Sequence, residues 1–288
     1  MTPEGGAVVL VATPIGNLGD LSPRAVEVLR TADLVFCEDT RRTRALLSAA
    51  GIGGGGRLRS LHAHNEAARV EEVLAALTAG ATVAVVSDAG TPGISDPGAH
   101  LVAAVAGAGQ RVTVVPGPSA VVAALVVSGL ATDRFCVEGF LPRKGEGRRL
   151  RLDALVAEQR TTVVLEAPGR LAATLADVAE RVPDRPLAVC RELTKVHEEV
   201  WRGTAAAAAA AFSGREVRGE VVVVVAGASG TRTGDEPGDD VVAAAVASRL
   251  AQGDSVKDAA TAVAAALGVH RRRAYAAAVG ARREGPSR

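Results

Sequence analysis

Residues 87–98 read SDAGTPGISDPG and directly follow the apolar run Thr82–Val86, which is long enough for one buried strand. These twelve positions hold three glycines, two prolines and two aspartates. That composition cannot continue a strand or start a helix early, so it predicts a tight loop of specific shape. A plain strand–helix connection is the alternative, but such a turn needs fewer residues. Because α/β sheets bind ligands at the ends of buried strands, we interpret 87–98 as a ligand-binding loop.

Strand and helix patterns alternate on both sides of this loop. The run AVVLVA at 7–12 is apolar throughout, as in strands buried on both faces, and Ser22-Pro23 is a good N-cap and first-turn pair. Further strands are expected at 33–37, 58–61, 82–86, 111–115, 134–138, 161–166, 187–192, 199–203 and 220–226. Helices are expected at 24–31, from the charged loop 38–43 to 50, from 66 to about 79, and at 99–108, 120–128, 170–181 and 204–212. This alternation predicts an α/β protein with a mainly parallel sheet.

Breaker residues divide the chain into three expected domains. The cluster Pro116-Gly117-Pro118-Ser119 separates an α/β domain at 1–117 from a second α/β domain at 118–228, in which 139–142 is expected to be a turn. Residues 227–240 have linker composition. Beyond them, 241–252, 256–267 and 270–280 predict a small helical appendage at 241–288. From residue 241 onward eight residues are basic and three acidic, which suggests an anionic polymer as partner. A solvated helical cap is the alternative.

The composition indicates the class of protein and its expected cellular location. The 288 residues are 48% hydrophobic and 23% charged, with a net charge of +1, as in soluble globular proteins. Cys37, Cys136 and Cys190 lie far apart and no CxxC occurs, so we expect neither a metal site nor a disulfide framework. The first residues show no signal peptide pattern, and the apolar runs are too short to span a bilayer. A cytoplasmic location is expected.

Common ligand motifs are missing from the sequence. No GxGxxG follows the first strand and no GxxxxGK[ST] occurs, which disfavours a dinucleotide site and a P-loop. The glycine-rich loop of common Rossmann-type methyltransferases is absent too. The ligand must therefore be held by something else, and the candidates are the loops 13–20, 38–43, 87–98 and 116–120.

Six stretches of sequence carry a resemblance to a known family. TPIGNLGDLSPRA, CEDTRRT, SDAGTPGISDPG, PGPSA, EGFLPRK and RELTKVHEE together resemble the enzymes with the tetrapyrrole-methylase fold. Within that fold they are similar to the bacterial enzymes that methylate the 2'-oxygen of a cytidine in small-subunit (16S) ribosomal RNA. The resemblance runs from about residue 8 to about 226, and the C-terminal helices also look like the tail of those enzymes. It implies a two-domain tetrapyrrole-methylase-like fold, a homodimer, and S-adenosylmethionine in the cleft between the two α/β domains.

The resemblance also implies which residues bind the cofactor. Pro14 and Gly16 would touch the cofactor from the loop 13–20, which we call the first loop. The methionine end and the ribose would be held by Asp88, Gly90, Thr91, Ile94 and Ser95. Ser119 and Ala120 would complete the pocket, with Pro168 and Gly219 as weaker matches on the adenine side. This agrees with physical expectation, because glycines let the backbone approach a ligand closely and a helix start suits a carboxylate.

Methyl transfer to a hydroxyl depends on orientation and is helped by a base about 10²–10⁴-fold. The candidate bases are Glu38, Asp39, His62, His64 and Glu66, among which the sequence does not choose. The histidines could equally be an ordinary helix-start pair, and the acids of the CEDTRRT loop could simply be salt-bridged.

The expected partner is 16S ribosomal RNA or the small ribosomal subunit. Clustering in loops makes Arg41, Arg42, Arg143, Lys144, Arg148 and Lys195 candidate ligands for RNA phosphates. Few aromatic residues occur, so a base-stacking platform is not expected. Two other functions remain open at this point: a methylase of a small molecule on the same fold, and a non-catalytic protein that binds an adenosine ligand.

Overall fold

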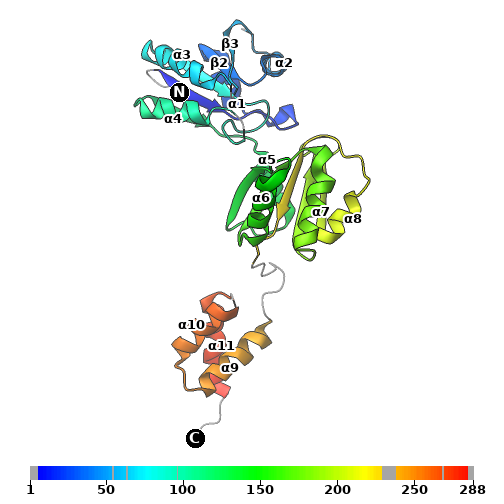
Figure 1. Cartoon of the computed structure of the whole chain (residues 1–288). Helices are drawn as coiled ribbons and strands as arrows, with labels where there is room; N and C mark the ends of the chain where they lie inside the picture. The colour runs from blue at the N-terminus through cyan, green and yellow to red at the C-terminus, as the bar shows by residue number, and fades with distance from the viewer. Residues whose placement is uncertain are drawn as a thin grey trace. The chain divides into compact units, whose positions relative to one another are not determined.

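The computed structural model describes residues 6–53, 55–62, 64–95, 97–228, 238–267 and 269–284 (Figure 1). The chain forms two compact units, 1–228 and 229–288, each of which is described by itself. The first unit contains two five-stranded sheets with helices against both faces of each. None of the helices in the described part of the chain is long and apolar enough to cross a membrane.

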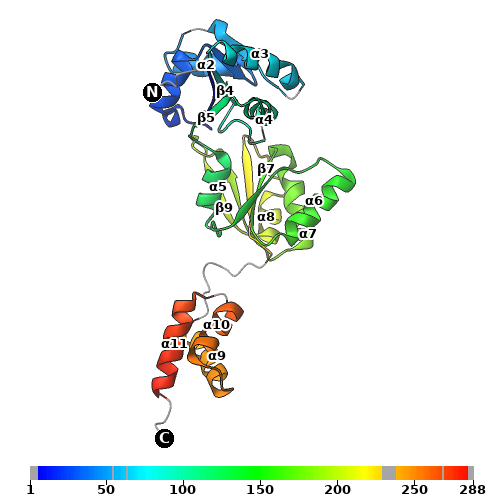
Figure 2. The same ribbon diagram turned by 90° about the vertical axis from the view of Figure 1, so that its left-hand side faces the viewer.

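The first sheet is entirely parallel and has the order β3-β2-β4-β1-β5. Its strands are β1 (Ala7–Val11), β2 (Leu34–Cys37), β3 (Leu58–Ser60), β4 (Thr82–Val86) and β5 (Arg111–Val115). Helices α1 (Pro23–Thr31) and α2 (Thr40–Ala49) cover one face, and α3 (Glu66–Thr78) and α4 (Ala99–Gly107) cover the other. Figures 1 and 2 show α3 and α4 side by side. The inner strands β1, β2 and β4 are almost entirely apolar because both of their faces are buried. The short 3₁₀ helices η1 (Leu18–Asp20) and η2 (Gly55–Arg57) lie in the connections.

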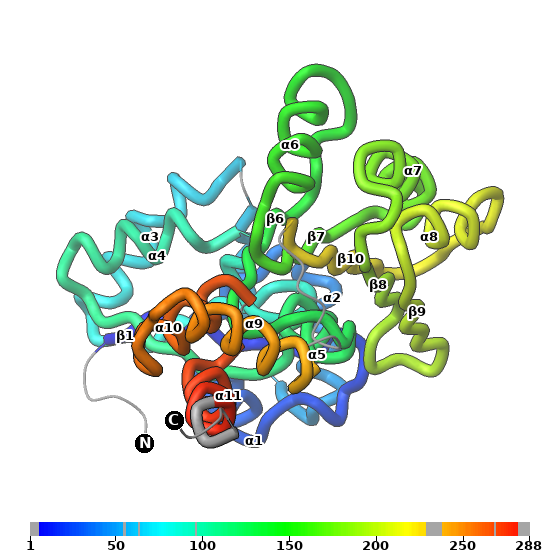
Figure 3. Tube along the Cα trace, turned by 90° about the horizontal axis from the view of Figure 1, so that it is seen from below, coloured from blue at the N-terminus to red at the C-terminus, as the bar shows by residue number. Residues whose placement is uncertain are grey.

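The second sheet has the order β6-β7-β10-β8-β9, which can be followed in Figure 3. It contains β6 (Phe135–Phe140), β7 (Thr161–Glu166), β8 (Pro186–Arg191), β9 (Glu199–Thr204) and β10 (Val221–Val225). Helices α6 (Gly145–Ala157), α7 (Leu171–Arg181) and α8 (Ala205–Phe212) pack on one face, and α5 (Ala120–Ser128) packs on the other. The 3₁₀ helix η3 (Pro168–Arg170) follows β7.

The expectation of a mainly parallel sheet is wrong for the second sheet. Only β6 and β7 pair in parallel there, whereas β7–β10, β10–β8 and β8–β9 are antiparallel. The physical reason lies partly in chain length: only seven residues join β8 to β9, too few for a parallel crossover. The antiparallel place of β10 between β7 and β8 is a long-range pairing that local patterns do not encode.

Two other local predictions in this region need correction. Residues 139 and 140 were expected to begin a turn, but they belong to β6, where Gly139 takes a positive φ of 70° at a register irregularity against β7. A glycine at a β-bulge carries the same sequence signal as a glycine in a turn. The next residues, 143–151, read RKGEGRRLR and are mostly basic. They run into α6, a helix that was not predicted. That helix buries Leu152 and Leu155 against the second sheet.

The helical unit contains α9 (Asp239–Ala251), α10 (Val256–Leu267) and α11 (Arg271–Glu284), which share an apolar core. Because α9 begins at Asp239, two residues before the expected start, Asp239 and Asp240 belong to its first turn. From Asp239 onward the sequence therefore has eight basic and five acidic residues, a smaller excess than a count from 241 gives.

Ile15 links the two sheets of the first unit. It follows β1 in the chain, yet it is 5% exposed and packs in the cluster formed by α5 and the second sheet. We expect Ile15→Ala to lower the free energy of unfolding by about 2–5 kcal/mol, as for other buried isoleucines. Ile94→Ala is the matched control because Ile94 is 49% exposed, and it should change stability by less than about 0.5 kcal/mol. Urea denaturation of both variants would measure the difference, and equal effects would contradict this role.

Candidate functional site

The loop 87–98 lies where the carboxyl end of β4 meets the end of β1. Backbone hydrogen bonds join the two loops: Thr13 N–H donates to Gly90 O at 2.9 Å, and Gly90 N–H donates to Thr13 O at 3.1 Å. The Thr13 hydroxyl also donates to Ser87 O at 3.2 Å, and Thr13 is almost fully buried. The first loop and the loop 87–98 are therefore held together by hydrogen bonds at the edge of the first sheet.

Glycine is required at three places in this loop. Gly90, Gly93 and Gly98 have φ values of 82°, 84° and 124°, which side chains rarely adopt. A Cβ at Gly90 would lie 3.4 Å from Ile15 Cγ2, which is ordinary van der Waals contact. We call this glycine-rich stretch the glycine cradle, since glycines let a backbone approach a ligand closely. The cofactor role expected for Gly90 stays a prediction.

Asp88 joins the loop to the start of α2. Its Oδ1 accepts a hydrogen bond from Asp39 N–H at 3.1 Å, and its Oδ2 lies 3.4 Å from Arg42 Nη1. Arg42 is mostly exposed, and Asp88 is mostly buried. The structure thus brings together two residues that the sequence assigned to different ligands, Asp88 to the cofactor and Arg42 to RNA.

The two acids of the CEDTRRT loop have different environments. Asp39 caps α2 by accepting from Arg41 N–H at 2.8 Å and pairs with the Arg41 guanidinium at 2.9 and 3.1 Å. These hydrogen bonds lower the pKa of Asp39 to about 2. Partial burial, followed by the neighbouring Asp88 carboxylate, raises the pKa of Glu38. A carboxylate with a raised pKa accepts a proton more readily, so Glu38 is the better base of the two.

Glu66 is committed to a structural contact. From the start of α3 its Oε1 accepts hydrogen bonds from Gly98 N–H at 3.1 Å and Leu101 N–H at 2.9 Å. Gly98 precedes α4 and has no side chain to cap that helix. Glu66 supplies the cap and holds the end of loop 87–98. These contacts argue against a proton-accepting role.

The two histidines lie close together beside the same edge. The rings of His62 and His64 are 6.0 Å apart. His64 is exposed, and His62 is half-buried with its Nδ1 buried and without a hydrogen-bond partner within the described structure. His62 lies close enough to Glu38 to influence the pKa of that carboxyl. The structure thus groups Glu38, Asp88, Arg42 and His62.

The loop between β8 and β9 brings the second sheet to the first loop. A Cβ at Gly16 would overlap the side chains of Lys195 and Thr194. Lys195 Nζ lies 2.7 Å from Glu192 Oε1 and 3.2 Å from Glu220 Oε2. Glu192 and Thr194 have φ values of 51° and 68°, an unusual strain for residues with side chains. An RNA phosphate would have to compete with two carboxylates for Lys195.

The other residues expected at the cofactor are spread around these loops. Thr91 donates its hydroxyl to Pro118 O at 3.3 Å, which brings loop 87–98 to the PGPSA turn. Ser119 and Ala120 stand at the start of α5, and Ser119 makes no side-chain cap. Ser95 and Ile94 are exposed, and Ser95 Oγ would lie 3.5 Å from a Cβ at Gly139 of β6. Pro14 is half-buried and Gly16 exposed in the first loop.

Pro168 and Gly219 both lie beside the second sheet. Pro168 opens η3 directly after β7, next to the buried Glu166. A Cβ at Gly219 would overlap the Glu192 carboxylate. Gly219 therefore belongs to the same group of loops as Lys195.

The remaining candidate RNA ligands differ in availability. Arg143 and Lys144 are exposed before α6. Arg148 is held inside the protein, because its guanidinium donates to Asp177 at 2.6 Å, to the Thr174 hydroxyl at 2.9 Å and to Pro142 O at 3.1 Å. Its side chain is only 12% exposed, so a phosphate would have to displace Asp177.

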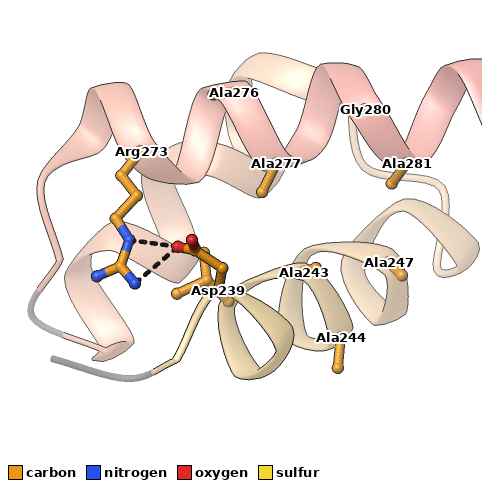
Figure 4. Close-up of a pocket in the computed structure, with 10 residues that line it drawn as sticks. Asp239, Ala243, Ala244, Ala247, Arg273, Ala276, Ala277, Gly280 and Ala281 are labelled. Carbon is orange, nitrogen blue, oxygen red and sulfur yellow. Dashed lines mark hydrogen bonds and ion pairs between the residues drawn. The ribbon is translucent and has the colours of Figure 1, made fainter. Parts of the chain in front are cut away.

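Two cavities were not foreseen from the sequence. One, of about 380 Å³, opens between the first loop and α2 and includes residues that no motif singled out: Leu18, Ala45, Leu46 and Ala49. Ala45, Leu46 and Ala49 follow helical spacing on α2, which was the available signal, whereas Leu18 lies in η1. The other, of about 670 Å³, lies inside the helical unit between α9 and α11 (Figure 4). Alanines form most of its wall, and Arg273 pairs with Asp239 at one end.

Comparisons with known proteins agree on one family. A model described as Tetrapyrrole (Corrin/Porphyrin) Methylases matches residues 7–209. The chain is 51% identical to the "Ribosomal RNA small subunit methyltransferase I" of Mycobacterium tuberculosis, over 98% of this chain and 97% of that protein. It is 45% identical to the protein of the same name from Thermotoga maritima, over 77% of this chain and 99% of that one. Among solved structures, diphthine synthase has a similar fold, with 14% identity, a TM-score of 0.60, and coverage of 77% and 90%.

The Glu66 contact generates a prediction. Glu66→Ala leaves the Gly98 and Leu101 N–H groups without their acceptor and should lower the free energy of unfolding by about 1–2 kcal/mol. Glu66→Gln keeps an acceptor oxygen and should lose about half as much. Glu71→Ala, at an exposed position on the same helix, should leave stability unchanged. Urea denaturation of the three variants checks this, and a stability for Glu66→Ala equal to that of Glu71→Ala would show that the cap is unimportant.

Proposed function

Because this chain belongs to the tetrapyrrole (corrin/porphyrin) methylase family, we propose that it transfers a methyl group from S-adenosylmethionine to a cytidine ribose 2'-hydroxyl of small-subunit ribosomal RNA. The observation that carries this proposal is the 51% identity, over nearly the whole of both chains, to a protein named for small-subunit ribosomal RNA methylation. The site geometry supports it, since the loop 13–20 pairs with the loop 87–98 through Thr13 and Gly90 and meets the β8–β9 loop of the second sheet at Gly16.

The cofactor is S-adenosylmethionine, which supplies an electrophilic methyl group on a positively charged sulfur when bound. We propose that the residues named from the family motifs bind it. The backbone at Gly90 and Gly93 would approach it closely, and the uncapped start of α5 would offer N–H groups to its carboxylate. Orientation of the acceptor hydroxyl toward the methyl group would then provide much of the rate.

Glu38 is our proposal for the general base. Its raised pKa suits it to accept the 2'-hydroxyl proton as the new O–CH₃ bond forms and the S–CH₃ bond breaks. Asp39 is less suited because its carboxylate is held ionised by Arg41. His62 and His64 lie near Glu38 and stay secondary candidates.

Three broader features are also proposals. The first is a division at about 117, 228 and 241 into two α/β domains and a helical domain. The second is a cytoplasmic homodimer, which exposed apolar side chains on the outer face of α5 and on the edge strand β6 support: Val122, Val126, Phe135, Val137 and Phe140. The third is that the helical unit assists RNA binding.

A labelling experiment tests the function. Labelled S-adenosylmethionine is incubated with the protein and with either naked 16S RNA or small subunits from an unmethylated strain. We expect label at a cytidine ribose, and bound cofactor without any transfer would favour a non-catalytic binding protein. Label only in a tetrapyrrole or another small molecule would favour the alternative enzyme class.

A glycine pair tests the cofactor loop. Gly90→Ala introduces a side chain at positive φ inside the cradle and should weaken S-adenosylmethionine binding more than tenfold. Gly51→Ala is the matched control, because Gly51 has a φ of 66° but open space around it. Both variants carry a similar backbone strain of about 1–2 kcal/mol. Calorimetric titration with S-adenosylmethionine therefore separates the effect of the local contact on affinity from the effect of general instability. Equal affinities in the two variants would exclude Gly90 from the site.

Salt dependence tests the RNA contacts. Replacing Arg143 and Lys144 together by Gln should reduce the slope of log K against log[salt] by about 1.4–1.8, the value for two lost phosphate contacts. The control is Arg149→Gln on the same segment, whose guanidinium is already paired with Glu146 and Asp153. An unchanged slope in filter binding would remove Arg143 and Lys144 from the interface.

A further inference from the structure

The cavity beside α2 adjoins the proposed cofactor site and extends from it onto a helix that supplies no cofactor residue. It measures about 380 Å³. One side is formed by the first loop and the other by α2, with Asp88 between them. Its wall consists of Thr13, Pro14, Gly16, Leu18, Arg42, Ala45, Leu46, Ala49 and Asp88.

Helix α2 presents a distinct face to this cavity. Residues 42, 45, 46 and 49 follow helical spacing and line the cavity together. Thr43 and Leu47 lie on another face and are buried. Arg44 and Ser48 point to neither and are exposed. The cavity face of α2 is therefore separate from the face that holds the helix in the fold, and its small side chains leave room for a ligand.

The cavity shares three residues with the proposed cofactor site: Pro14, Gly16 and Asp88. No residue of α2 belongs to the cofactor set. Methyl transfer requires the acceptor oxygen at about 3–3.5 Å from the methyl carbon, so the acceptor must occupy space that adjoins the cofactor directly. A cavity that continues from the cofactor residues onto an unassigned surface meets that requirement.

The chemistry of the wall matches a nucleotide. Leu18, which is 58% exposed, and the alanines of α2 offer an apolar surface to the faces of a base. Arg42 is 67% exposed, and its contact with Asp88 is loose at 3.4 Å, so its guanidinium can reach a phosphate. Apolar side chains beside a cationic group suit a nucleotide turned out of its stack.

We propose that the α2 cavity holds the acceptor nucleotide of the RNA, with the base against Leu18, Ala45, Leu46 and Ala49 and a flanking phosphate at Arg42. This rests on the proposed function and adds to it the surface that receives the target nucleotide. The 2'-hydroxyl then faces the side of the cavity formed by Pro14, Gly16 and Asp88, where the methyl group is delivered.

Filling the cavity tests this assignment. Ala45→Leu and Ala49→Leu put larger side chains into it at exposed helix positions, where leucine is well tolerated. Each variant should lower kcat/KM for small ribosomal subunits at least tenfold while the Kd for S-adenosylmethionine changes less than twofold. Ser48→Leu is the matched control on the solvent face of the same helix and should behave as the wild-type protein. Thermal unfolding confirms that all three variants are folded.

A second variant avoids any steric effect on α2. Arg42→Gln should weaken subunit binding and flatten its salt dependence while cofactor affinity is retained. Unchanged kcat/KM in both leucine variants would overturn the proposal. A loss of S-adenosylmethionine affinity as large as the loss of kcat/KM would also overturn it, because the cavity would then be part of the cofactor site. Wild-type protein is measured alongside: if it transfers no label, the proposed function fails, whereas an active wild type with unaffected variants contradicts the cavity assignment alone.

Discussion

The pairing of Thr13 with Gly90 is the constraint on which the site depends. Two reciprocal backbone hydrogen bonds fix the loop after β1 to the loop after β4, and both strands are central in the first sheet. Two residues further on, Ile15 is buried against α5 and the second sheet. One short segment thus ties the glycine cradle to the opposite half of the unit. Any movement of this segment would change the cradle and its distance from the second sheet together.

Carboxylates hold the rest of the site by capping helices. Asp39 caps α2 and Glu66 caps α4, and each does so at the edge where the parallel strands of the first sheet end. Asp88 joins the first of these caps to the loop 87–98. Because backbone N–H groups at helix starts attract negative charge, acids at this edge serve structure as readily as chemistry. Glu38 differs from them, since partial burial, followed by the neighbouring Asp88 carboxylate, raises the pKa of its side chain.

All the site residues named above belong to the first unit and not to the helical unit. The Thermotoga maritima relative is matched over 99% of its length by 222 residues, about the size of the first unit alone. The first unit holds both sheets and the whole site, whereas α9–α11 carry a small excess of positive charge.

Much was determined by the sequence alone. Apolar runs such as 7–11 and 82–86 predicted buried strands, because burial requires apolar residues at neighbouring positions. The glycines and prolines of 87–98 predicted a tight loop, in which three glycines take positive φ. The motif resemblance identified the family before any geometry. Contacts between residues far apart in the chain could not be predicted, because they depend on long-range packing. Examples are the antiparallel pairing of β10, the capping of α4 by Glu66 from 32 positions away, and the cavity between Leu18 and Ala49. Local patterns encode which residues are buried or bent, but only tertiary structure decides which distant group each of them meets.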